Sequence, residues 1–84
     1  MLRFMIDPNL PVPRWRQLAD ILRERTESGE LTGRLPGEVH LMQEYGLAHG
    51  TVRKALKELR DEGLIITTPG LGSFVAASPP ERRQ

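Results

Sequence analysis

The sequence predicts an α+β fold from three observations. Apolar residues recur at helical spacing in three successive segments, and a three-residue turn with a glycine separates the second segment from the third. After residue 63 the pattern changes to β-branched and apolar residues interrupted by Pro and Gly, which indicates a hairpin. Three helices followed by a β-hairpin, with a possible short N-terminal strand, are the order of a winged helix-turn-helix.

The composition places narrow limits on function. A chain of 84 residues forms one small domain, which buries only roughly 60% of the surface exposed on unfolding. The net charge of +1 excludes strongly basic tails and acidic solvating chains. With no cysteine, there are no disulfides, thiolate metal sites or thiol nucleophiles. No apolar run approaches the roughly 20 residues of a membrane span. These features favour a cytoplasmic binding module over an enzyme.

Pro and Gly divide the chain. A β-prone lead at 2–6 precedes a segment whose three prolines exclude a helix or a central strand. We expect a lead strand and Pro-rich linker over 1–12, the winged helix-turn-helix over 13–76 and a disordered tail over 77–84. The exposed edge of the lead strand is a candidate dimer contact.

The first helix is predicted over 13–28, where Pro13 suits the first turn and Gly29 the C-terminal cap. Its apolar stripe is Trp15, Leu18, Ala19 and Leu22. A tight connector at 33–37 follows. Trp15 and Tyr45 could form a ligand box, but packing in so small a core is the favoured interpretation.

The second helix is predicted to begin near Glu38, after a Gly37 cap, and to end at Gly46. The third is predicted over 49–62, with Gly63 as its cap. Only residues 46–48 separate the two, which is typical of a helix-turn-helix. The inward stripe of the third helix is Val52, Ala55, Leu56 and Leu59. Strands are expected at 64–68 and 73–76.

The outer face of the third helix is cationic. Residues 49–60 contain four Lys or Arg and one acid, and the like-charged pair Arg53 and Lys57 lacks an answering acid in that window. Such a face suits duplex DNA in a major groove, where small residues at the helix start allow close approach and Arg53 can reach a guanine. An ordinary solvated helix face is the alternative that the residues alone leave open. The side chains expected to face DNA are His49, Gly50, Thr51, Arg53, Lys54 and Lys57.

The hairpin tip is expected to lie along a minor groove through Gly70, Leu71 and Gly72, with a plain tight turn as the alternative. No Lys or Arg occurs from 64 to 81. The wing itself is therefore expected to contribute backbone and hydroxyl groups rather than charge.

Seven segments, in order, resemble the GntR family of bacterial transcriptional regulators over roughly 10–76. They are WRQLAD at 15–20, SGEL at 28–31, RLPGE at 34–38, YGL at 45–47, GTVRKAL at 50–56, EGLI at 62–65 and PGLGSFV at 69–75. The resemblance implies a winged helix that binds a near-palindromic DNA operator as a homodimer, usually as a repressor. It also implies that Thr51 and Arg53 face DNA and that Gly70 and Gly72 form the wing tip.

The sequence departs from the family pattern at several contact positions. Gly37 stands where the family usually has Ser or Ala, and Val39 stands where it has a DNA-contacting Arg. Leu71 stands at the wing tip where Arg or Lys is common. Ala48 and His49 replace Ser or Thr and Arg. We therefore expect weaker or narrower DNA binding than that of a typical member, but not its loss. We also hypothesise that His49 makes binding slightly tighter at pH 6 than at pH 8, which an unchanged pH dependence in His49→Gln would contradict. A neutral His49 that makes a single hydrogen bond is the alternative.

Other classes of function are less well supported. A winged helix that binds protein without DNA would need apolar residues where Arg53, Lys54 and Lys57 stand. His40 and His49 are the only histidines, and the sequence offers no third ligand to complete a metal site with them. No metal or other cofactor is therefore expected. The family usually carries an effector-sensing domain after the wing, and this sequence ends soon after it. Whether the chain is an isolated domain or a complete short regulator stays open, as does any inducer.

Overall fold

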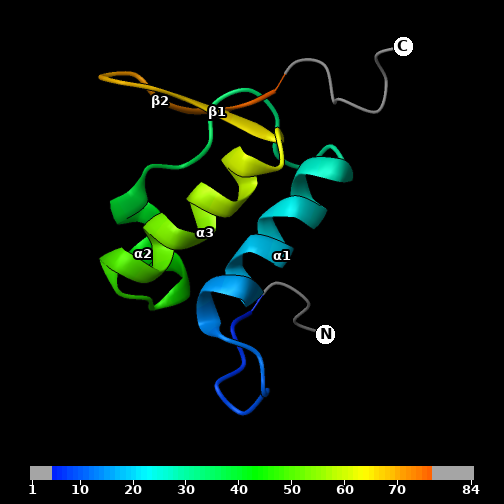
Figure 1. Ribbon diagram of the computed structural model, residues 1–84, viewed down its shortest axis with the longest axis vertical. Helices are drawn as coiled ribbons and strands as arrows, with labels where there is room; N and C mark the ends of the chain where they lie inside the picture. Colours follow the sequence, from blue (N-terminus) through cyan, green and yellow to red (C-terminus); the bar gives the residue numbers. More distant parts are fainter. Residues whose placement is uncertain (1–4, 77–84) are drawn as a thin grey trace.

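The computed structural model describes residues 5–76 (Figure 1). These residues form α1 (Arg14–Glu27), α2 (Glu38–Tyr45), α3 (His49–Asp61), β1 (Ile65–Thr68) and β2 (Gly72–Val75). The winged helix-turn-helix prediction is confirmed. The expected tail at 77–84 and residues 2–4 of the expected lead strand lie outside the described residues, while Met5 and Ile6 belong to no strand.

The helix boundaries agree with the prediction to within one residue. Pro13 is the N-cap of α1 rather than its first helical residue, because its ψ of 146° is not helical, while its carbonyl already accepts hydrogen bonds from the amides of Arg16 and Gln17. The chain leaves α2 through Gly46, whose φ of 67° lies in the left-handed region that a glycine adopts without strain. Gly46 therefore fixes the sharp turn between α2 and α3.

The core lies between the helices and the inner face of the hairpin. In Figure 1, α3 lies between α2 and α1, and the hairpin covers the C-terminal end of α3. The predicted stripe of α3 is buried throughout, with exposed fractions of 0%, 0%, 3% and 1% for Val52, Ala55, Leu56 and Leu59. Burying this stripe fixes the rotation of α3 and turns its opposite face to solvent. None of the helices within residues 5–76 has the length and apolar content to cross a membrane.

The connector after α1 pairs with the wing, which the sequence did not predict. β1 and β2 pair antiparallel, with Ile65 opposite Val75. On the other edge of β2, the amide of Leu35 donates to the carbonyl of Ser73 at 2.8 Å, and the amide of Val75 donates to Gly33 at 2.7 Å. The connector thus covers the free edge of β2 and fixes the wing to the helical core.

A buried glutamine holds the Pro-rich segment against α1. The side chain of Gln17 is 7% exposed. Its Nε2 donates to the carbonyls of Asp7 and Val12 at 3.0 and 2.9 Å, and its Oε1 accepts from the amide of Asp7 at 2.8 Å. In a segment that forms neither helix nor strand, one side chain therefore satisfies three backbone groups.

Candidate nucleic-acid interface

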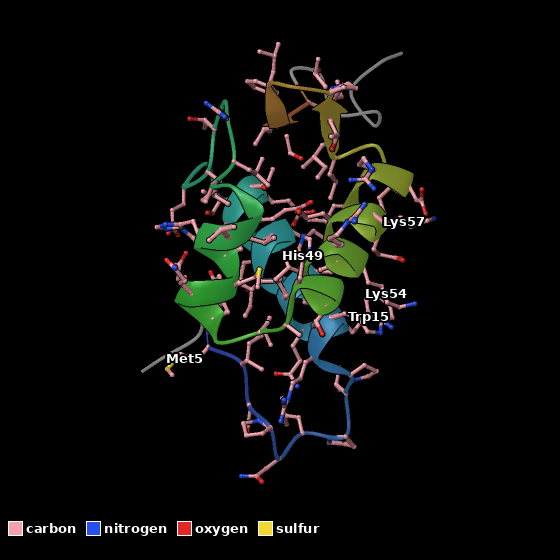
Figure 2. All side chains as sticks on the ribbon, turned by 90° about the vertical axis from the view of Figure 1, so that its left-hand side faces the viewer. Met5, Trp15, His49, Lys54 and Lys57 are labelled. Carbon is pink, nitrogen blue, oxygen red and sulfur yellow. The ribbon has the colours of Figure 1, made fainter. Side chains whose placement is uncertain are left out.

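The outward residues of α3 form an exposed cationic ridge, which we define as His49, Gly50, Arg53, Lys54 and Lys57. The side chains of His49, Arg53 and Lys57 are 54%, 66% and 67% exposed. Figure 2 shows His49 on the side of α3 that faces α2, and Lys54 and Lys57 on the other side. Thr51, also predicted to face DNA, is half-buried.

Carboxylates from outside residues 49–60 lie beside three basic side chains of the ridge. The charges of that window alone did not reveal them. Glu38 Oε1 lies 2.7 Å from His49 Nε2, and Glu38 Oε2 lies 4.0 Å from Arg53 Nε. Lys57 Nζ donates to Asp61 at 3.0 Å. The acids that answer the cations come from α2 and from the residue just beyond that window. Because all these groups are largely exposed, the ion pairs contribute little to stability and can exchange for other anions.

Lys54 has an aromatic partner. Its Nζ lies 4.9 Å from the centre of the Trp15 ring, a cation–π distance that joins the ridge to the first turn of α1 (Figure 2). Trp15 is only partly buried and packs against the edge of the core. The indole therefore has a packing role, and it also orients one cation of the ridge.

The wing tip is a tight turn with an apolar apex. Gly70 and Gly72 have φ values of 82° and 113°, both in the region that favours glycine, and Leu71 between them is 59% exposed. At Gly72 a side chain would also be crowded, because a Cβ there would lie 3.2 Å from Arg34 Nε and the arginine side chain would have to shift. The turn thus depends on its glycines, as predicted.

Two cations reach the wing from outside it, although the wing segment itself contributes no Lys or Arg. The guanidinium of Arg34 lies against Gly72. Arg60 of α3 donates to the hydroxyl of Thr67 at 3.2 Å, and that hydroxyl lies 2.9 Å from the hydroxyl of Ser73. Sequence reasoning missed both arginines, because only the pairing of residues 33–35 with β2 and the packing of α3 bring them here.

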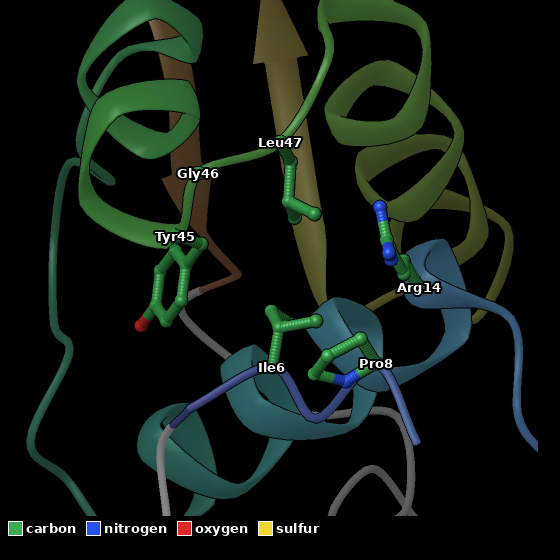
Figure 3. Close-up of a pocket in the computed structure, with 6 residues that line it drawn as sticks. All are labelled: Ile6, Pro8, Arg14, Tyr45, Gly46 and Leu47. Atoms are coloured by element: carbon green, nitrogen blue, oxygen red, sulfur yellow. The ribbon is translucent and has the colours of Figure 1, made fainter. Parts of the chain in front are cut away.

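The described residues also form a small open pocket of about 210 Å³, to which no residue of the ridge contributes (Figure 3). Its lining residues are Ile6, Pro8, Arg14, Tyr45, Gly46 and Leu47. Trp15 is not among them, so Trp15 and Tyr45 do not form a common box. The hydroxyl of Tyr45 accepts a hydrogen bond from Arg25 Nη1 at 2.6 Å. Burial raises the pKa of Tyr45 above its ordinary value of 10.0, and the charge of Arg25 opposes that rise.

The two histidines lie in separate pairs. His40 Nε2 is 3.6 Å from Glu44 of the same helix, whereas His49 contacts Glu38. Across residues 5–76, no group of three or more His, Cys, Asp or Glu side chains is placed to hold a metal ion.

Comparison with known proteins agrees with this geometry. Residues 13–75 match the family described as "Bacterial regulatory proteins, gntR family". The chain is 35% identical over 68 residues to the histidine utilization repressor of Klebsiella aerogenes, covering 79% of this chain and 28% of that protein. It is 38% identical over 65 residues to the mannosyl-D-glycerate transport/metabolism system repressor MngR of Escherichia coli, covering 75% and 27%. The chain thus spans under a third of the length of these relatives.

Solved structures share the fold. YtrA from Sulfolobus acidocaldarius, a GntR-family transcription factor, superimposes with a TM-score of 0.81 at 31% identity, covering 90% of this chain and 82% of that one. AraR(DBD) in complex with operator ORX1 gives a TM-score of 0.78 at 28% identity, covering 86% and 93%. Family match, identity and fold agree over the same residues. The chain therefore belongs to the gntR family of bacterial regulatory proteins, which are DNA-binding transcriptional regulators rather than enzymes.

Proposed function

We propose that this chain binds operator DNA sequence-specifically as the DNA-binding unit of a bacterial transcriptional repressor. In this proposal α3 enters the major groove through the ridge, and the wing at 69–73 lies at the minor groove. The proposal places the protein in the cytoplasm, with the nucleoid. The repressors among its relatives, and the AraR domain solved with an operator, support it.

The main structural support for this proposal is that position 50 is a glycine. It lies in the first turn of α3, where a Cβ would meet nothing within 4 Å. Its φ is not positive, so neither packing nor backbone conformation requires glycine here. A glycine in a helix costs about 0.5–1 kcal/mol relative to alanine. A missing side chain at the start of an exposed cationic helix fits close approach of the backbone to a partner, and DNA is the partner that suits the surrounding cations.

Specific binding requires two copies of the chain. One copy has a single α3 to place in the major groove and so covers about one half-site, because half-sites lie one turn of duplex apart, about 34–36 Å. We therefore propose a homodimer on a near-palindromic operator, with the wing tips and ridges of both copies in contact with DNA.

Selection from a random duplex library, followed by gel shift of the wild type, tests the proposal. The expected result is a motif with two inverted halves, bound much more tightly than random duplex at physiological salt. An Arg53→Ala variant is expected to lose discrimination at one base pair of each half. Failure of the wild type to enrich any duplex would refute DNA recognition, and enrichment of a single half would refute the dimer.

A further inference from the structure

Glu38 places a carboxylate inside the cationic ridge. It is the first residue of α2, its side chain is 41% exposed, and it contacts two ridge residues. Its Oε1 lies 2.7 Å from His49 Nε2, and its Oε2 faces Arg53 Nε at 4.0 Å. The carboxylate is therefore held from one side by the imidazole, while its second oxygen lies beside the guanidinium.

This position is unfavourable for binding the DNA backbone. A carboxylate among cations that face phosphates repels the phosphates and offsets part of the attraction of Arg53. Nonspecific affinity would be higher without it. The carboxylate repels the backbone of every duplex, so it contributes to specificity only if certain base pairs bind it and offset that repulsion. The compensating group must be a hydrogen-bond donor, because an ionised carboxylate only accepts.

The major groove supplies donors in one arrangement that matches the pair. A G·C base pair presents two acceptors, guanine N7 and O6, next to one donor, cytosine N4. Arg53 offers donors and Glu38 an acceptor, side by side. An A·T pair instead has its donor between two acceptors, so thymine O4 would meet the carboxylate unfavourably.

We propose that Glu38 is a specificity-determining residue that reads a G·C base pair together with Arg53. Arg53 donates to guanine N7 and O6, and Glu38 accepts from cytosine N4, at one position of each half-site. The inference rests on the proposed DNA binding, since it names the base pair that the ridge recognises. Glu38 also lowers affinity for duplexes that offer no donor at that position.

The test measures binding to the selected operator, to its three variants at each base pair and to a G·T mismatch at the Arg53-dependent position, by fluorescence anisotropy. At the position where Arg53→Ala loses discrimination, the wild type is expected to prefer C over T opposite the same guanine, in a G·C pair against a G·T mismatch, by about five- to tenfold, because the mismatch keeps the guanine that Arg53 reads. Glu38→Met removes the acceptor and keeps the length of the side chain. In that variant the preference should fall below about twofold, while affinity for random duplex rises. Glu38→Gln should lose the same preference, because an amide accepts from cytosine or donates to thymine.

Glu27→Gln is the matched control, since it removes the same charge from the C-terminal end of α1. It should keep the preference for C over T, and thermal melting by circular dichroism establishes that all variants fold. A Glu38→Met protein that folds and still prefers C would overturn the assignment. An A·T pair at the Arg53-dependent position would do the same. Failure of the wild type to bind any duplex would instead refute the proposed function.

Discussion

The ammonium group of Lys54 on α3 lies 4.9 Å from the centre of the Trp15 ring on α1. This contact joins α1 and α3, which are far apart in the sequence, at the edge of the ridge. Because Trp15 is the only tryptophan of the chain, this contact can be observed directly in solution.

Binding of DNA is expected to change the fluorescence of Trp15. A phosphate competes with the indole ring for the Lys54 ammonium, and an exposed cation–π contact is worth only about 0.5–1 kcal/mol. Titration with operator duplex should shift the emission of the wild type. A Lys54→Met variant should show a much smaller shift on saturation. An equal shift in both proteins would mean that Lys54 stays on the ring in the complex.

Gly50→Ala is expected to separate stability from binding. Nothing in the described residues obstructs a methyl group there, so the variant should be more stable by about 0.5–1 kcal/mol, measured by denaturant unfolding. The same methyl group would hold the α3 backbone away from a groove, so operator affinity should fall. A variant that gains stability and keeps full affinity would remove Gly50 from the interface.

Arg53 and Lys57 are expected to contribute in different ways. Arg53→Ala should cost about 1–3 kcal/mol at one base pair, because a guanidinium can read guanine. Lys57→Ala should weaken binding to all sequences about equally and lower the salt slope by about one unit, as a phosphate contact does. Anisotropy titrations of both variants, on operator and random duplex at several salt concentrations, distinguish the two roles. Sequence-dependent loss in Lys57→Ala would reverse the assignment.

The salt dependence of binding should be shallow for each half-site. Val39 and Leu71 stand at two positions where the family usually has cations, and both are exposed, at 64% and 59%. The cations that remain on the ridge and beside the wing are Arg53, Lys54, Lys57, Arg34 and Arg60. Because Arg53 is assigned to a base, the other four cations as phosphate contacts predict a slope of log affinity against log salt of about −3.6. A measured slope per half-site steeper than about −6 would contradict this count of contacts.

Folding stability should decrease at alkaline pH because of Tyr45. Burial raises the pKa of this hydroxyl in the folded state above 10.0, so the unfolded chain releases its proton first. The contribution to stability is therefore complete below pH 10 and is lost as the pH rises through the folded-state pKa. Tyr45→Phe should lack this loss. Below pH 10 the variant should also be less stable by about 1 kcal/mol, because the bond from Arg25 is gone.

Phenolate absorbance checks the same prediction independently, since Tyr45 is the only tyrosine in the chain. Its apparent pKa in the folded protein should lie above that in denaturant. Identical titration curves in the two states would exclude a role for Tyr45 in alkaline unfolding.

The sequence by itself determined the elements and the orientation of the ridge. Helical spacing of Val52, Ala55, Leu56 and Leu59 placed these residues inward, and all four are buried. Gly46 and the glycines of the wing tip marked the turns, because positive φ values there favour glycine. These features are local: spacing, caps and turns act within a few residues, so a pattern along the chain reveals them.

Only the tertiary structure decided what surrounds the ridge and the wing. Glu38 meets His49 across eleven residues, Arg34 reaches Gly72, and residues 33–35 pair with the far edge of β2. Gln17 likewise holds a Pro-rich segment ten residues away. Each of these contacts depends on how packed elements lie against one another. Side chains far apart in sequence become neighbours only after the buried leucines have fixed the angles between helices and hairpin, so local periodicity carries no information about them.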